Sequence, residues 1–165
     1  MFTLKPLSPE GIPQALEKAD HYRLLNEPTE AESICLDVLQ IDPDNQHALV
    51  SLLLALSDRL TRGYAIDATQ AREVVDRLRD NYQRAYYAGI IAERQAKARL
   101  GQGGPGARHD AYEWLREAMD HFETAESLRP PGNDDPILRW NACARMIMRN
   151  SLSSRPVEGF EPQLE

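Results

Sequence analysis

The sequence has little cysteine and few aromatic residues, and it has no long apolar run. Two of its 165 residues are cysteine, and 7% are aromatic. No apolar run approaches the ~20 residues that cross a bilayer as a helix, so no membrane span is expected. The N-terminus also lacks the apolar core of about 7–15 residues found in secretory signals. A cytoplasmic location is therefore expected.

Positive charge is also scarce. The chain has 19 Lys and Arg against 26 Asp and Glu, which gives a formal net charge of −7 at pH 7. Nucleic-acid binding depends on neutralising phosphates with Lys and Arg, so this balance argues against it. The charge is uneven, because residues 10–44 hold nine acids and two bases, whereas 137–155 hold four arginines and no acid. Head-to-tail contact between copies, and hence a homo-oligomer, is left open.

Signatures of metal binding and catalysis are missing as well. Cys35 and Cys143 each lie in an apolar helical pattern, which favours buried free thiols over a disulfide or a reactive site. The four histidines form no two-ligand pair on one helix, so no zinc is expected. The GQGGPG stretch at 101–106 lacks the Lys-Ser/Thr ending of a phosphate loop and indicates a flexible connector. No cofactor and no enzymatic activity are expected.

Apolar residues recur with a 3.6-residue period and predict seven helices. The clearest lies in 28–45, where Pro43 ends the helix at Asp42. Its apolar stripe consists of Ala31, Ile34, Cys35, Val38 and Leu39. The other helices are expected at 13–26, 45–62, 68–80, 82–100, 108–128 and 134–150.

Several residues predict details of these helices. Thr29 and Glu32 have the spacing of a capping box. Gly63 fits the position after a helix end, and Asp67 fits a helix cap. Gly89 in the middle of a helix costs ~1 kcal/mol relative to alanine, so another helix is expected to pack closely against it.

No stretch has the pattern of a strand, so the fold class is all-α. Residues 1–11 are expected to form an N-terminal arm, 12–150 a single helical domain, and 151–165 a C-terminal tail. The tail or the arm could also fill a groove of the domain, with Phe160 and Leu164 as apolar anchors.

One spacing of residues occurs twice. Ala31, Cys35, Val38 and Pro43 match Ala118, Phe122, Ala125 and Pro130. This pattern resembles the tetratricopeptide repeat, a helix-turn-helix unit of ~34 residues that ends in proline. Tyr22 and Gly89 also stand at positions of that pattern, whereas its first-helix Trp and Leu-Gly are missing from the first repeat. About three repeats and a capping helix would cover 12–150.

The resemblance implies a right-handed α-α superhelix whose concave face binds a peptide or a protein surface. The first helix of each repeat lines that face in the family. The residues expected to bind the partner are Asp20, Arg23, His47, Tyr86, Tyr87, Arg94, Arg139, Asn141 and Arg145. The family's clamp for a C-terminal carboxylate is not expected, because Leu16 and Asp20 stand where it needs Lys and Asn.

Arg139, Trp140, Asn141 and Arg145, in the last predicted helix, form the polar cluster of greatest interest for binding. Arginine can form two parallel hydrogen bonds with a carboxylate, and asparagine can form hydrogen bonds with a peptide backbone. The same residues could instead pack Trp140 into the core and bond helix ends. A small enzyme or ligand-binding domain with a polar pocket near Arg139 and Asn141 is the alternative to a non-catalytic interaction module.

Overall fold

The computed structural model describes residues 1–61 and 68–157. Within these ranges the chain forms seven α-helices and no strand, which confirms the all-α class and the helix count. The helices are α1 (Ile12–Leu24), α2 (Pro28–Ile41), α3 (Gln46–Leu60), α4 (Thr69–Asp76), α5 (Asn81–Gln102), α6 (Ala107–Leu128) and α7 (Asp135–Asn150). A short 3-10 helix, η1 (Pro9–Gly11), precedes them.

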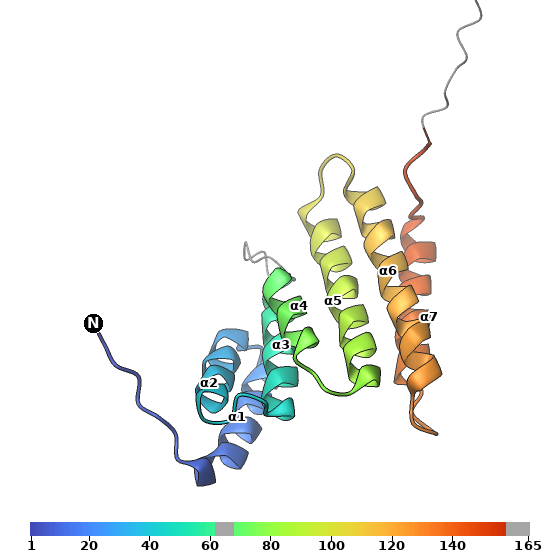
Figure 1. The fold of residues 1–165 in the computed structure, drawn as a ribbon. Helices are drawn as coiled ribbons and strands as arrows, with labels where there is room; N and C mark the ends of the chain where they lie inside the picture. Colours follow the sequence, from blue (N-terminus) through green and yellow to red (C-terminus); the bar gives the residue numbers. More distant parts are fainter. Residues whose placement is uncertain (62–67, 158–165) are drawn as a thin grey trace, which may run out of the picture.

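The helices are stacked side by side, with the α1–α2 pair at one end and α7 at the other (Figure 1). Each helix packs against the next one in the chain, while α1 also contacts α3, and α3 contacts α5. Arg139 and Cys143 of α7 contact Glu93 of α5, so α1, α3, α5 and α7 follow one another along one side of the row. Helices α2, α4 and α6 lie along the other side, where Arg72 of α4 lies over the Trp114 ring of α6.

The core has two parts that meet at α5. The first contains α1 to α4 together with Ile91 of α5, and the second contains α5 to α7 together with Leu152. Leu54 of α3 and Tyr87 of α5 pack against both parts. Helix α5 is thus the element that joins the two halves of the molecule.

The predicted capping box at α2 is wrong. The helix begins at Pro28, and the preceding Glu27 makes no side-chain cap. Proline suits the first helical position because its missing N–H needs no partner there, so Thr29 falls inside the helix. Glu32 instead forms an ion pair with Arg59 of α3 and ties the two helices together.

Two other helix ends differ from the predictions. Helix α4 ends at Asp76 rather than at 80, because the Asp80 carboxylate accepts a hydrogen bond from the Tyr82 backbone N–H at 3.0 Å and starts α5. Helix α5 runs through Gly101 to Gln102, beyond the expected end at 100. Gly63 and Asp67, for which roles at helix ends were predicted, lie outside the described residues.

The turn between α5 and α6 is tied to the helices by Arg99. Its guanidinium donates to the Gly103 carbonyl at 2.8 Å and to the Pro105 carbonyl at 3.1 Å, and it pairs with Asp110 at 2.8 Å. Gly103, Gly104 and Gly106 have φ of 66°, 85° and 75°. These positive values favour glycine, so the glycine-rich stretch serves the geometry of this turn.

The predicted close packing at Gly89 is confirmed. A Cβ atom added at Gly89 would lie 2.6, 2.8 and 2.9 Å from three ring carbons of Phe122 on α6. Phe122 is fully buried. The glycine therefore lets α6 place an aromatic ring directly against the backbone of α5.

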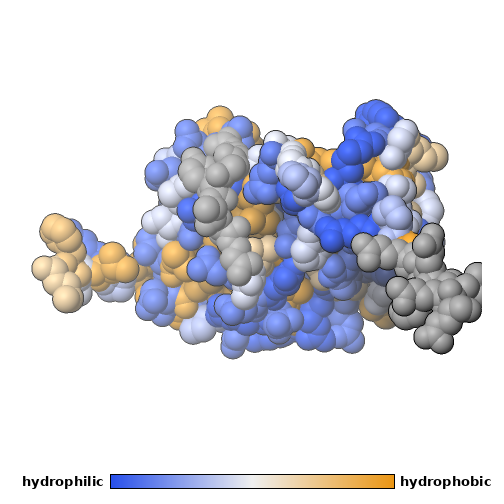
Figure 2. All heavy atoms as spheres, turned by 90° about the horizontal axis from the view of Figure 1, so that it is seen from above, coloured by the Kyte–Doolittle hydropathy of each residue, from blue (hydrophilic) through white to orange (hydrophobic). Residues whose placement is uncertain are grey.

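The chain before α1 and the chain after α7 differ in how closely they pack against the helices. The first residues of the predicted N-terminal arm leave the row of helices (Figure 1) and include the exposed Met1, Phe2 and Leu4, whereas Leu7 packs against the first core. Figure 2 shows these first residues projecting at the left, while hydrophilic residues cover most of the visible surface. At the other end Leu152 is 7% exposed in the second core, and His109 Nδ1 lies 2.8 Å from the Ser153 carbonyl oxygen. Phe160 and Leu164 lie outside the described residues.

Candidate functional site

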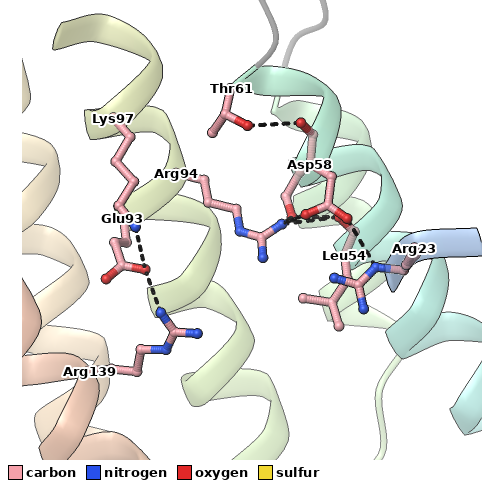
Figure 3. A network of polar contacts seen from close by, with 9 residues as sticks. Arg23, Leu54, Asp58, Thr61, Glu93, Arg94, Lys97 and Arg139 are labelled. Carbon is pink, nitrogen blue, oxygen red and sulfur yellow. Dashed lines mark hydrogen bonds and ion pairs between the residues drawn. The ribbon is translucent and has the colours of Figure 1, made fainter. Parts of the chain in front are cut away.

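Polar side chains from α1, α3, α5 and α7 meet along one side of the row, and Figure 3 shows part of this arrangement. We call these residues the polar strip. They are Asp20, Arg23, His47, Ser51, Asp58, Glu93, Arg94, Lys97 and Arg139. The strip forms three clusters, and each is built around one carboxylate. In every cluster that carboxylate contacts at least one side chain from another helix.

The central cluster is built around Asp58 of α3 (Figure 3). One carboxylate oxygen accepts from Arg23 Nε of α1 at 3.0 Å, and the other accepts from Arg94 of α5. Arg94 also donates to the Ser57 hydroxyl at 2.9 Å and to the Leu54 carbonyl at 3.3 Å. Asp58 therefore joins two predicted site residues, Arg23 and Arg94, that are far apart in the sequence.

Burial lowers the pKa of the Arg94 guanidinium from its ordinary value, and Asp58 opposes this shift. The side chains of Arg23, Asp58 and Arg94 are each about one-fifth exposed, at 21%, 22% and 19%. The ion pairs are thus partly shielded from water, where charge interactions are stronger than at a fully solvated surface.

The second cluster is built around Asp20 of α1. Its carboxylate lies 2.7 Å from His47 Nε2 and accepts from the Ser51 hydroxyl at 2.7 Å, both on α3. The two predicted site residues Asp20 and His47 are thus brought together. This cluster is more exposed than the central one, since the side chains of His47 and Asp20 are 52% and 44% exposed.

The third cluster is built around Glu93 of α5, which is 1% exposed. Arg139 of α7 lies 3.4 Å from one carboxylate oxygen, and Lys97 lies 3.7 Å from the same atom. The Cys143 thiol of α7 lies 3.7 Å from the other oxygen. Burying a carboxylate is costly unless it is paired, and here both cations supply the pairing.

Arg139 and Lys97 keep part of their surface in water. Their side chains are 41% and 42% exposed, although both contact the buried Glu93. Burial alone would lower the pKa of Arg139, but the Tyr86 hydroxyl and the Glu93 carboxylate outweigh it, and the pKa is raised. Arg139 therefore stays cationic next to Tyr86, another predicted site residue.

The tyrosines of α5 continue the polar strip with aromatic surface. Tyr82 and Tyr86 stack with ring centroids 5.8 Å apart, and Tyr86 meets Tyr87 edge-on at 5.2 Å. Tyr86 also contacts Phe122 at 5.9 Å, so it belongs partly to the second core. Tyr86 and Tyr87 are half-buried, which leaves part of each ring accessible.

Asn141 and Arg145 lie apart from Arg139. Asn141 borders a hollow of about 270 Å³ between α6 and α7, with Glu123, Ile137 and Trp140 in its lining. Trp140 packs against the second core and donates from Nε1 to Glu123 at 3.0 Å. Arg145 is exposed. Of the three predicted site residues on α7, only Arg139 joins the polar strip.

Four residues of the strip were not among the predicted binding residues: Ser51, Asp58, Glu93 and Lys97. The repeat pattern places Asp58 and Glu93 on the same side as Arg23 and Arg94, so the sequence indicated that they could belong to the site. Their pairing could not be read from the spacing, because each partner lies on a different helix.

Both cysteines are buried free thiols, as expected. Burial raises the pKa of each from 9.0 to about 12, helped by Asp20 near Cys35 and by Glu93 near Cys143. The folded state thus holds these protons more tightly than the unfolded state. The resulting stabilisation is complete below about pH 9, and it is lost as the pH rises toward about 12.

We expect neither thiol to react with an aromatic disulfide reagent at pH 8 while the protein is folded. Both should react within minutes in guanidinium chloride, because the thiolate is the reactive form and unfolding restores it. Absorbance of the released thiolate measures this directly. Rapid labelling of the folded protein would contradict the account.

No protein-family model, curated protein or solved structure matches this chain. Among residues 1–61 and 68–157, no group of three His, Cys, Asp or Glu side chains is arranged to hold a metal ion. Over the same described residues, no helix combines the length and apolar character needed to cross a membrane.

Proposed function

We propose that the chain is a non-catalytic interaction module of the tetratricopeptide type, and that the polar strip binds an acidic peptide segment of a partner protein. The recurring spacing of Ala31, Cys35 and Pro43 at Ala118, Phe122 and Pro130 supports the family. In this proposal the row of helices is a right-handed superhelix, and the side of α1, α3, α5 and α7 is its concave face.

One observation carries the choice of ligand. In the two clusters around Asp58 and Glu93, four cations share two carboxylates, although the whole protein has a net charge of −7. The exposed portions of Arg139 and Lys97 can pair with a further carboxylate, because guanidinium and ammonium groups carry several donors. The Tyr86 ring beside them offers apolar contact.

A cytoplasmic location belongs to the same proposal. Two free thiols suit a reducing compartment, where disulfides are rare. A partner protein in that compartment with an exposed acidic segment is the ligand that we propose.

A selection from a random peptide library tests this function. The wild-type protein should enrich peptides rich in Asp and Glu. A triple variant, Glu93→Gln, Lys97→Gln and Arg139→Gln, removes the third cluster's charges without leaving a buried carboxylate unpaired. We expect it to bind the selected peptides at least about tenfold more weakly, since hydrogen bonds to charged groups contribute roughly 1.5–3 kcal/mol.

Arg116→Gln on α6 is the matched control, because it lowers the net charge by the same amount at an exposed site away from the strip. It should bind like the wild type. Enrichment of peptides without acidic residues, or equal binding by the triple variant, would refute the proposal.

A further inference from the structure

The two ends of the row of helices carry apolar side chains that nothing in the described chain covers. Helix α1 exposes Leu24 at 86%, followed by Leu25 at 57%, and α7 exposes Leu138 at 63% and Met148 at 68%. End helices of stacked repeats normally present a polar outer face. Exposed leucine and methionine at both ends therefore indicate contact surfaces.

The outer face of α7 combines apolar and basic side chains. Leu138, Arg145, Met148 and Arg149 are all exposed. At 3.6 residues per turn they fall on the side of the helix opposite the buried Pro136 and Cys143. Arg139 and Arg155 are paired with Glu93 and Asp110, whereas Arg145 and Arg149 take part in none of the ion pairs among the described residues.

The outer face of α1 is hollowed and lies in the acidic part of the chain. A hollow of about 810 Å³ runs along the exposed side of the helix, and it reaches Asp20 of the polar strip. Its other lining residues include Gln14, Glu17, Lys18, His21 and Leu24. Residues 10–44 contain nine acids against Lys18 and Arg23. Arg23 is held by Asp58, and three of the nine acids are held by residues of other elements, since Asp20 contacts His47, Glu32 pairs with Arg59 and Asp44 pairs with Arg79. The two ends are thus opposite in charge, and both expose apolar side chains.

We propose that a second copy of this chain packs its α7 along the hollow beside α1, so that copies associate head to tail. Leu138 and Met148 then lose contact with water against Leu24 and Leu25, while Arg145 and Arg149 approach the acidic α1–α2 end. The contact repeats the helix-on-helix packing that links neighbours within the row.

The distribution of charge favours this head-to-tail arrangement over a two-fold symmetric dimer. Two α7 helices facing each other would bring the arginines of both copies together, and two α1–α2 ends would bring acids together; like charges in contact are unfavourable. A head-to-tail contact leaves one free end on each copy, so it grows into chains as the concentration rises.

Sedimentation velocity with end-blocked variants tests the proposal. Leu24→Asp blocks the α1 end, and Met148→Asp blocks the α7 end. Both positions are exposed, so folding should be unchanged by circular dichroism. The wild type should show a mass that rises with concentration and falls with added salt, whereas each variant alone should remain a monomer.

The decisive sample is the equimolar mixture of the two variants. Each retains the end that the other lacks, so the mixture should form a one-to-one dimer and nothing larger. Leu36→Asp, at an equally apolar but laterally placed site on α2 that is 48% exposed, should associate like the wild type. A monomeric wild type, a monomeric mixture, or association of either blocked variant alone would overturn the proposal.

Discussion

Replacing Phe122 with alanine is expected to destabilise the protein by about 3–5 kcal/mol, the usual cost of removing a buried aromatic ring. Phe122 is 0% exposed and lies in the second core, where it contacts both Tyr86 and the backbone at Gly89. Loss of the ring leaves a cavity between α5 and α6. A urea titration that follows helix content measures the change.

The same replacement should reverse the effect of Gly89→Ala. In the wild type the added methyl group would lie within 2.9 Å of three ring atoms, so overpacking is expected to cost about 1–3 kcal/mol. In the Phe122→Ala background that space is empty. The higher helix propensity of alanine should then stabilise the protein by up to about 1 kcal/mol.

Gly101→Ala is the control, because Gly101 also lies in α5 but nothing stands within 4 Å of an added Cβ. It should be neutral or slightly stabilising in both backgrounds. If Gly89→Ala has the same sign with and without the Phe122 ring, the close approach of α6 to α5 is not what makes glycine necessary.

Replacing Asp58 with alanine is expected to destabilise the protein by about 2–3 kcal/mol. Removing one partner of a fully buried ion pair costs about 3–5 kcal/mol, and the one-fifth exposure of this cluster reduces that figure. Arg94 loses its carboxylate in a site where burial already lowers its pKa. The cost should therefore arise mainly from the unpaired Arg94.

A double-mutant cycle separates this cause from simple loss of contacts. Adding Arg94→Met to Asp58→Ala should recover part of the lost stability, because no unpaired guanidinium then remains. Asp120→Ala, at an exposed site on α6, should change stability by less than about 0.5 kcal/mol. Strictly additive effects of Asp58→Ala and Arg94→Met would contradict the proposed role of the pair.

The helical fold was predictable because its signal is local. The apolar period placed all seven helices, and Gly89 in a helix interior correctly indicated close packing. The errors occurred where two local rules competed. Pro28 rather than Thr29 determined how α2 begins, and the cap at Asp80 shortened the helix before it.

The candidate site was only partly predictable because it depends on pairs between helices. Asp20, Arg23, His47 and Arg94 were expected on one side. The structure pairs Asp20 directly with His47, and it joins Arg23 to Arg94 through Asp58. The burial of Glu93 could not be read from the sequence, since a charged residue is rarely buried without partners and those partners lie on α7 and one turn away. Asn141 and Arg145 share a helix with Arg139 but face elsewhere.

The central claim is that the polar strip binds an acidic peptide, and its most direct test is a titration followed by nuclear magnetic resonance. A peptide from the selection is added to the labelled protein, and amide shifts are mapped along the chain. The account predicts the largest shifts at Tyr86, Arg94 and Arg139, with little change on α2 and α4. Shifts concentrated on α2, α4 and α6 would contradict it.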